Sequence, residues 1–180
     1  MKNLFLSLVL VLTSLCSFGQ VKKEFVALTE VEQLVFKKIN DYRVKNGLKS
    51  IIWCPNSYKS AYHHSYYLSD PNVEISHFEP EDVEGIDEIN THNDRICGVL
   101  NSPGVVSVEN VMTVQASDRW LNRKDCDGKK TTSDFIFKAW YESDSHNKAM
   151  LNPSMTHGSI AIVREKDGNY CRPVMVFYKK

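Results

Sequence analysis

Residues 159–178 read SIAIVREKDGNYCRPVMVFY, two apolar segments on either side of a polar turn. Residues 159–163 and 170–178 are rich in Ile, Val, Phe and Tyr, and Asp167 and Gly168 lie between them. Runs of β-branched and aromatic residues joined by an Asp-Gly turn are typical of a β-hairpin. The carboxyl-terminal part of the chain is therefore predicted to form an antiparallel hairpin.

Upstream of the hairpin, the first helical pattern of the chain follows Thr29. Thr29 and Glu32 have the spacing of a capping box, and Gly47 suits the left-handed position that ends a helix. Between them, apolar residues recur at helical spacing, namely Val31, Leu34, Val35, Ile39 and Tyr42. This segment is predicted to be an amphipathic helix.

The rest of the chain alternates between helical and β-rich patterns. A second helix is expected over residues 55–70, with Pro55 in its first turn, and residues 105–114 are β-rich. Residues 122–133 are polar and are predicted to be a loop, after which Ser133 can cap a third helix. A shorter helix begins near His146. Since there is no internal repeat and no linker, the pattern predicts a single α+β domain.

The start of the chain has the pattern of a secretory signal peptide. Lys2 gives it a positive end, and residues 4–15 are almost wholly apolar. Ser17 and Gly19 place small residues at −3 and −1 of a cut after Gly19. The apolar stretch is shorter than the roughly 20 residues that a membrane-spanning helix needs. We therefore expect removal of this segment rather than a transmembrane helix.

This pattern predicts a signal peptide over residues 1–19 and one domain over residues 20–180. It also predicts export, to the extracellular space or the periplasm. Lipid anchoring at Cys16 is a minority alternative, because Leu15 stands where a lipoprotein has a small residue.

Removal of the signal peptide changes the charge and the cysteine count. It takes away Lys2 and no acid, leaving 161 of 180 residues with 21 basic and 22 acidic side chains. A charge near zero argues against nucleic-acid binding, which needs a clustered positive surplus. Cys16 is also lost, and an even number in an exported protein favours two disulfides. The remaining cysteines are Cys54, Cys97, Cys126 and Cys171, and their three possible pairings stay open.

The sequence contains no standard nucleophile motif. It has no G-x-S-x-G, no glycine-rich phosphate loop and no H-E-x-x-H, which removes the commonest hydrolase, kinase and zincin signatures. His63 and His64 are adjacent on a predicted helix, so their side chains point about 100° apart and cannot easily share one ion. His92 and His157 have no acidic partner pattern nearby.

Glu142 and His146 are four residues apart, the spacing of a pair on one helical face. Residues 143–145 read Ser-Asp-Ser, which favours a break in the helix between them. His77 is the other histidine that lies near a helix end. On pattern alone, surface or core histidines are more common than a His/Glu site.

Five pieces of sequence occur in the order found in one known family. They are residues 39–48 (INDYRVKNGL), Trp53 with Pro55, Ser76-His77, Glu109-Asn110-Val111, and residues 140–153 with the pattern W-x-x-S-x-x-H-x-x-x-x-L-x-P. Over about residues 31–178 the chain therefore resembles the CAP superfamily. This superfamily comprises cysteine-rich secretory proteins, antigen 5 and pathogenesis-related protein 1, and shares the SCP domain.

The resemblance implies a three-layer α-β-α sandwich, with a small antiparallel sheet between layers of helices. It also implies a cleft where histidines and glutamates converge, and by position these are His77, Glu109 and His146. A second glutamate of the family would fall at Ser143. Glu142 lies one residue earlier and is the weakest candidate, because a shift of one residue turns a side chain about 100° around a helix.

Such a cleft would suit a divalent cation. Neutral imidazoles are good zinc ligands, and carboxylates beside them fix their orientation. Two histidines with one or two carboxylates leave a coordination position open, unlike a closed structural site. The interpretation is an exported, non-enzymatic binding or interaction module whose cleft can hold zinc or another divalent ion.

Two alternatives to this interpretation stay open. One is a metal-dependent secreted hydrolase of the peptidase type, and the other is a binder of sterols or lipids, as some relatives are. The partner is an extracellular protein, a lipid or a glycan, and no nucleic acid or transmembrane segment is expected. The second helix is rich in tyrosines that could line an apolar groove, although core packing explains them better: Tyr58, Tyr62, Tyr66 and Tyr67.

Overall fold

The structure is a computed structural model of the chain. It describes residues 25–79, 91–125, 127–165 and 168–180. The predicted signal peptide and the alternative lipid anchor at Cys16 lie outside the described residues. Within them, no helix is both long enough and apolar enough to cross a membrane.

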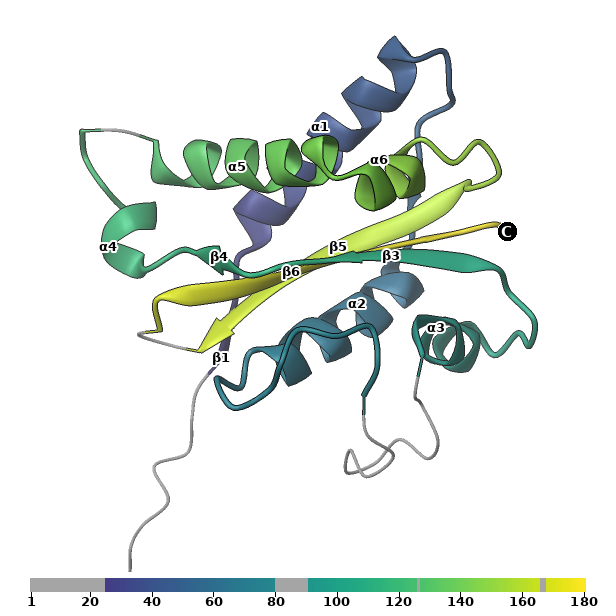
Figure 1. Cartoon of the computed structure of the whole chain (residues 1–180), viewed down its shortest axis with the longest axis horizontal. Helices are drawn as coiled ribbons and strands as arrows, with labels where there is room; N and C mark the ends of the chain where they lie inside the picture. Colours follow the sequence, from purple (N-terminus) through teal and green to yellow (C-terminus); the bar gives the residue numbers. More distant parts are fainter. Residues whose placement is uncertain (1–24, 80–90, 126, 166–167) are drawn as a thin grey trace, which may run out of the picture.

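A six-stranded sheet forms the centre of the fold (Figure 1). Its strands are β1 (Phe25–Ala27), β2 (Ile52–Trp53), β3 (Ser107–Val111), β4 (Val114–Gln115), β5 (His157–Glu165) and β6 (Tyr170–Tyr178). The order is β1-β5-β6-β3, with β2 also paired to β5 and β4 to β6. Strands β5 and β6 are antiparallel neighbours, which confirms the predicted hairpin. Strand β2 runs parallel to β5, so the small sheet is not wholly antiparallel.

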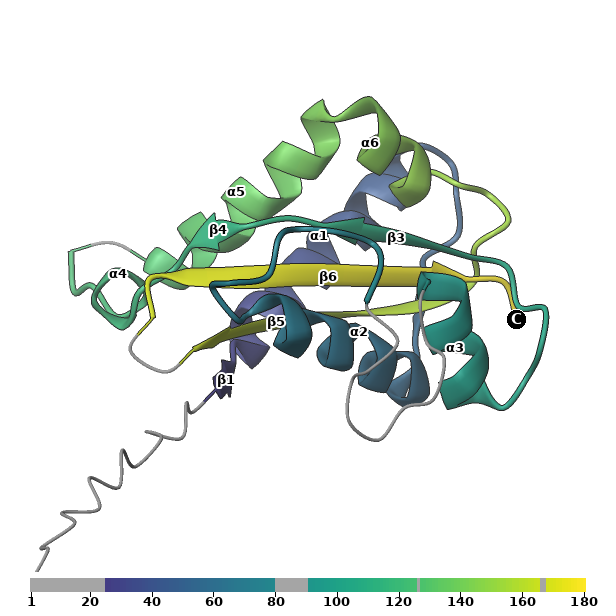
Figure 2. The ribbon, with the colours of Figure 1, turned by 60° about the horizontal axis from the view of Figure 1, so that its bottom comes forward.

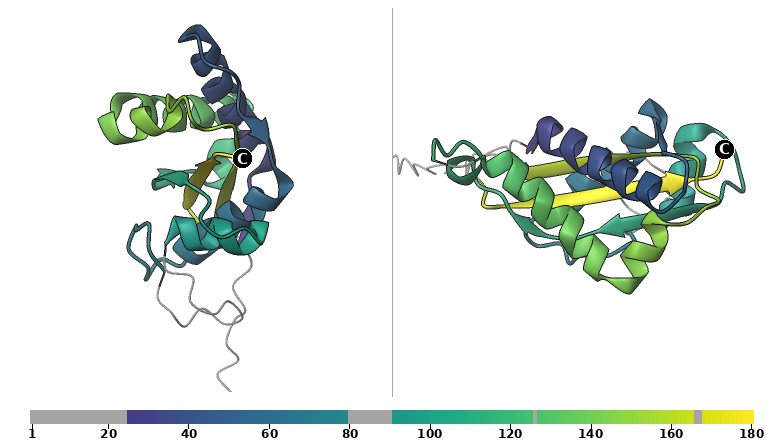
Figure 3. Two further views of the ribbon diagram at one scale, coloured as in Figure 1. Left: turned by 90° about the vertical axis from the view of Figure 1, so that its right-hand side faces the viewer. Right: turned by 90° about the horizontal axis from the view of Figure 1, so that it is seen from above.

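Helices cover both faces of this sheet (Figures 1 and 2). On one face lie α1 (Thr29–Lys45), α4 (Asp118–Leu121), α5 (Gly128–Glu142) and α6 (Asp144–Met150). On the other face lie α2 (Pro55–Leu68) and α3 (His92–Leu100). Seen from above in Figure 3, α1 and α5 lie over β5 and β6. This arrangement confirms the expected three-layer sandwich.

The two central strands, β5 and β6, contribute side chains to two separate cores, because successive side chains of a strand point to opposite faces of the sheet. Ile160 and Ile162 of β5 pack with α1, α5 and α6. Ala161 of β5 and Val174 and Val176 of β6 pack with α2 and α3. All five side chains are fully buried. Each face of the sheet is therefore sealed by its own helices.

Hydrogen bonds from Arg43 connect the end of α1 to the end of α6 and to the segment that follows it. The residue is only 1 % exposed, and its guanidinium donates to the backbone oxygens of Met150 at 2.5 Å, Asn152 at 3.1 Å and Met155 at 3.2 Å. Its Nε donates to the oxygen of Lys49 at 3.0 Å. The contact with the last residue of α6 fixes the helix that carries His146.

The predicted capping box at the start of α1 is wrong. Thr29 is already helical, and Leu28 occupies the N-cap without a side-chain hydrogen bond. Glu32 Oε1 instead accepts from the backbone nitrogen of Ile162 at 2.8 Å and lies 3.4 Å from the Tyr58 hydroxyl. The glutamate thus provides an acceptor for a backbone N–H on the outer edge of β5. A local sequence pattern cannot reveal such a contact between distant segments.

The predicted loop over residues 122–133 is shorter than expected. Helix α5 begins at Gly128, and the Asp127 side chain caps it by accepting from the nitrogen of Lys130 at 2.9 Å. Ser133 lies inside the helix, where its hydroxyl donates to the oxygen of Lys130 at 2.7 Å. The helix therefore starts one and a half turns earlier than its apolar positions suggest.

Helix α3 is an element that the sequence patterns did not reveal. It starts with a reciprocal capping box, in which Thr91 accepts from the Asp94 nitrogen and the Asp94 side chain accepts from Thr91. Arg95 and Ile96 are its buried residues, so it lacks a long apolar stripe. This helix supplies part of the candidate site.

The structure does not show the predicted disulfides. Cys54, Cys97 and Cys171 carry free thiols, and Cys126 lies outside the described residues. Cys171 is fully buried in β6, whereas Cys54 and Cys97 are half-buried at the start of α2 and inside α3.

Candidate functional site

A cavity of about 570 Å³ lies between α3, β3 and α6. His77, in the segment after α2, and Glu109 of β3 both line it. Ser145 and Lys148 line it from α6, the helix that also carries His146. The structure thus brings the segments holding three of the predicted site residues to one place.

Glu109 fixes the orientation of His77. The glutamate side chain is buried, and its Oε1 lies 3.0 Å from His77 Nδ1, while its Oε2 accepts from Arg95 Nη2 at 2.7 Å. An ionised carboxylate has no proton to give, so His77 Nδ1 is the donor, and in the neutral ring the lone pair lies on Nε2. The side chain of His77 is 43 % exposed, so a ligand can reach that nitrogen from the cavity.

The charge of Glu109 is held in place by these same partners. Burial raises the pKa of Glu109, but the hydrogen bond from His77 and the positive charge of Arg95 lower it more. The net pKa lies below the usual value of a glutamate. Glu109 therefore remains ionised, with both oxygens engaged.

A second buried carboxylate, Glu79, lies behind this pair. Its Oε1 is 2.6 Å from His64 Nδ1 and 3.5 Å from Arg95 Nη1, and its Oε2 is 3.2 Å from His63 Nδ1. Burial raises the pKa of Glu79, yet the contacts with the histidines and the charge of Arg95 outweigh it. The pKa falls to about 2.

His64 links the two carboxylates to the backbone. Its Nδ1 faces Glu79, and its Nε2 lies 2.8 Å from the carbonyl oxygen of Ser76. Neither partner has a proton to give, so both ring nitrogens donate and the imidazole carries a positive charge. His64 and Arg95 together balance the charges of Glu79 and Glu109. This buried neutral cluster supports His77, which is its exposed outer member.

Two further imidazoles lie near His77. The ring centre of His92 is 6.2 Å away, and His92 Nε2 lies 3.2 Å from the carbonyl oxygen of Ser107. Burial lowers the pKa of His92. Burial, and then the charge of His77, lower the pKa of His146. Both rings therefore favour the neutral form that binds metal ions.

Glu142 lies apart from this cluster. Its side chain is 60 % exposed at the end of α5, 3.7 Å from Lys138 Nζ. The helix is interrupted at Ser143, which separates α5 from α6, as the Ser-Asp-Ser pattern predicted. Glu142 therefore does not share a helical face with His146.

The donor set of the cavity suits an open cation site better than a closed one. In the described parts of the chain, no three His, Cys, Asp or Glu side chains are placed to hold one ion. Both oxygens of Glu109 are already engaged, so imidazole nitrogens are the available ligands. His77 and His92 line the cavity, whereas His146 lies on α6 and is not one of the lining residues. A cation bound at His77 would feel Glu109 through the imidazole ring.

Sequence patterns did not identify several members of the cluster. His92, Arg95, His64 and Glu79 reach it from α2, α3 and the segment between them. The sequence offered one usable signal, namely two charged or polar residues of α3, His92 and Arg95, three apart on one helical face. The glutamates contact them only through tertiary structure.

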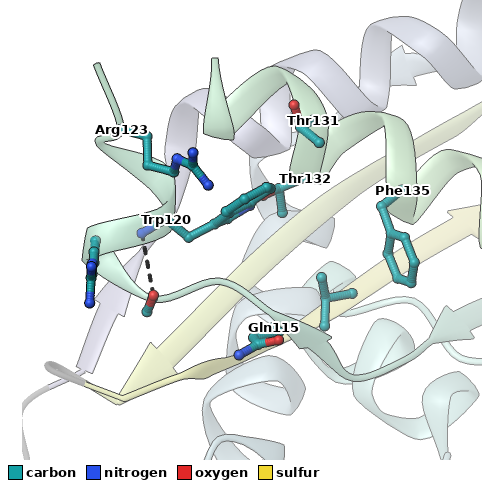
Figure 4. A pocket seen from close by; sticks show the side chains of 9 residues that line it. Gln115, Trp120, Arg123, Thr131, Thr132 and Phe135 are labelled. Atoms are coloured by element: carbon teal, nitrogen blue, oxygen red, sulfur yellow. Dashed lines mark hydrogen bonds between the residues drawn. The ribbon is translucent and has the colours of Figure 1, made fainter. Parts of the chain in front are cut away.

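A separate cavity of about 700 Å³ lies between α4, α5 and β4 (Figure 4). Trp120 and Phe135 line it, and Arg123 lies over the Trp120 ring at 5.3 Å from its centre. It contains none of the predicted site residues.

Sequence and structure comparisons place the chain among known proteins. The sequence profile of the CAP family, described as the cysteine-rich secretory protein family, matches residues 36–178. No curated protein matches the chain. The profile covers the five ordered pieces of sequence quoted above.

Solved bacterial structures share the fold. An outer surface protein of Borrelia burgdorferi superposes with a TM-score of 0.63 at 17 % identity, covering 88 % of this chain and 98 % of that one. An extracellular protein with an SCP domain from Bacillus anthracis gives 0.59 at 18 % identity, covering 84 % of this chain and 41 % of that one. A cysteine-rich secretory protein of Staphylococcus aureus gives 0.52 at 17 % identity, covering 84 % and 39 %. This chain thus spans about two fifths of the last two proteins.

Proposed function

The chain belongs to the cysteine-rich secretory protein (CAP) family, and we propose that it is an extracellular, non-enzymatic binding module. Its histidine-lined cavity binds a divalent cation, with zinc as the preferred ion. The similar structures from Bacillus anthracis and Borrelia burgdorferi are described as extracellular and outer surface proteins, which supports a location outside the cytoplasm.

The orientation of His77 carries this proposal. Its Nδ1 is bound to Glu109 at 3.0 Å, and Glu109 is held in turn by Arg95 at 2.7 Å. A carboxylate on one ring nitrogen fixes the tautomer and raises the basicity of the other, as it does for metal-bound histidines in general. His77 lines the cavity, and His146 comes from the helix that borders the same cavity.

The state of the carboxylates supports binding over hydrolysis. A metal-dependent hydrolase needs a base close to the reacting water, with a pKa near the working pH. Glu109 has both oxygens engaged and a pKa below the usual value, so it is a weak base. Glu79 is buried behind it with a pKa of about 2.

Calorimetric titration of the purified chain with Zn²⁺ tests the proposal. We expect the His77→Ala/His146→Ala double variant to bind at least about tenfold more weakly than the wild type. His157→Ala is the matched control, because His157 lies on β5 and does not line the cavity. We expect Glu142→Gln to bind like the wild type. Equal zinc affinity of the wild type and the double variant would contradict the proposal.

A further inference from the structure

Six aromatic rings form a continuous row across four segments of the chain. The row begins in β1, follows α2, passes through β2 and ends on α1. The ring-centre distances are 4.5 Å for Phe25–Tyr66, 6.5 Å for Tyr66–Tyr62, 6.0 Å for Tyr62–Tyr58, 5.6 Å for Tyr58–Trp53 and 5.0 Å for Trp53–Phe36. We call these six residues the aromatic row.

The aromatic row is accessible to solvent. Tyr66 is 46 % exposed and Trp53 is 38 % exposed, and the other four residues are half-buried. Tyr58, Tyr62 and Tyr66 are four residues apart and so follow one side of α2. Tyr58 and Tyr62 also contact the core between the sheet and the helices α2 and α3, so core packing explains part of their position. Their remaining surface is available to a ligand.

A cavity of about 680 Å³ lies at the α1 end of the aromatic row. Phe36, Trp53 and Tyr58 line it together with polar side chains of α1, which are Thr29, Glu32, Gln33, Lys37 and Asn40. Aromatic surface beside a few hydrogen-bonding groups is the usual composition of a small-molecule site. The cavity shares no lining residue with the histidine-lined cavity.

The polar groups of this cavity do not favour a charged ligand. The ammonium group of Lys37 is paired with Asp41 at 2.6 Å. Burial raises the pKa of Glu32 to about 7, against hydrogen bonds from Ile162 and Tyr58 that lower it. The carboxyl group is thus only partly ionised near pH 7, and a neutral ligand rich in hydroxyl groups fits a cavity without an unpaired full charge.

We propose that the aromatic row and its cavity bind a neutral, extended oligosaccharide. Successive sugar rings stack their C–H faces on the aromatic rings, and hydroxyl groups at one end bond to the exposed amide of Gln33. Tyrosine and tryptophan suit this role because each combines a flat apolar face with a polar edge. The row follows α2 for its length, so it matches a linear chain of sugars better than a compact ligand.

Two other extended ligands fit less well. A proline-rich peptide also docks on aromatic grooves, but proline has no N–H to offer the amide oxygen of Gln33, which lines the cavity. An acyl chain would take the exposed amide of Gln33 out of water without giving it a hydrogen bond, which costs free energy. Sugar hydroxyl groups both donate and accept.

Calorimetry with cellohexaose and chitohexaose, two neutral β-linked probes, tests this inference on the purified chain. We expect at least one probe to bind, and Trp53→Ala to weaken that binding about tenfold or more. Tyr66→Ala, at the exposed end of the row, should weaken it severalfold without unfolding the protein. Phe135→Ala is the matched control, since Phe135 is 55 % exposed but lines the separate cavity of Figure 4.

The outcomes are distinct. Weaker binding in both row variants, with an unchanged melting temperature for Tyr66→Ala, supports the site. Absence of binding by both probes, or equal weakening by Phe135→Ala, overturns it, as does binding of a proline-rich peptide or a fatty acid in place of the sugars. The His77→Ala/His146→Ala variant should bind the sugar normally, so this inference and the cation site can fail independently.

Discussion

Arg95 lies between two buried carboxylates, and one guanidinium serves both. Its Nη2 is 2.7 Å from Glu109 and its Nη1 is 3.5 Å from Glu79. The arginine side chain is 1 % exposed, and the two glutamate side chains are fully buried. Breaking a buried ion pair by removing one partner is costly, because it leaves a charge without compensation in a medium of low polarity.

We expect Arg95→Met to lower the free energy of unfolding by roughly 3–5 kcal/mol at neutral pH, since the two buried carboxylates then keep only His64 as a counter-charge. Denaturant unfolding followed by circular dichroism measures the loss. Lys37→Met is the control, because its ion pair with Asp41 is exposed and such pairs contribute less than about 1 kcal/mol. Similar losses of unfolding free energy in the two variants would contradict a larger contribution of the buried ion pairs than of an exposed one.

The same cluster sets the stability of the protein in acid. The pKa of Glu79 in the folded chain is about 2, against a usual value of 4.5 for a glutamate. A depressed pKa contributes stability above the unfolded value, and that contribution disappears as the pH falls through the folded value. We therefore expect stability to fall between about pH 4.5 and pH 2. Denaturant unfolding of Glu79→Gln across this range should give a flatter curve, and an equally steep one would contradict the assignment.

At the scale of elements, a hydrogen bond to one side-chain carboxyl group connects α1 to β5. Glu32 accepts from the nitrogen of Ile162 at 2.8 Å, in the stretch of β5 between its pairings with β1 and β2. Burial raises the pKa of Glu32 to about 7. A raised pKa means that the protonated group stabilises the fold, and this contribution is lost as the pH rises through the folded value.

We expect Glu32→Gln to be more stable than the wild type at pH 8, by roughly 1–3 kcal/mol, because the amide keeps an acceptor for Ile162 without a buried charge. Below about pH 4.5 the two proteins should be equally stable. Guanidinium unfolding at both pH values provides the measurement. Gln33→Glu, at the exposed neighbouring position of α1, controls for a general effect of charge. A variant that is less stable at pH 8 would disprove the buried charge.

The elements with a regular pattern could be predicted from the sequence. The hairpin, α1 and α2 follow from β-rich runs, helical spacing and Pro55. Helix α3 could not be predicted, because Ile96 is its single fully buried apolar residue. For the site, His77, Glu109 and His146 came from the family resemblance. Arg95 remained unseen because its role depends on contacts between segments that no local pattern encodes.

At the scale of the whole molecule, the reactivity of the free thiols indicates which parts of the fold open to solvent. Cys171 is fully buried, and burial raises its pKa to about 12. Cys54 is half-buried at the start of α2; burial raises its pKa, but hydrogen bonds with Tyr178 and Ser57 bring it below the usual value. A thiolate reacts and a thiol does not. Cys54 should therefore be the more reactive of the two.

We expect iodoacetamide to label Cys54 in the native protein well before Cys171, which should react only on global unfolding. Peptide mapping by mass spectrometry after timed labelling distinguishes the two sites. Labelling in denaturant is the control, and there both cysteines should react at similar rates. Equal rates in the native protein would show that the sheet opens locally at β6.

The outer edge of β5 has a consequence for self-association. β1 pairs with its last residues, β2 with its first, and the backbone of Leu28 and the carboxyl group of Glu32 engage both polar groups of Ile162 between them. The positions of this edge that are already paired offer no template to a further strand. Growth of β-rich aggregates through this side of the sheet would first require α1 to detach, so the helix protects the protein against fibril formation at that edge.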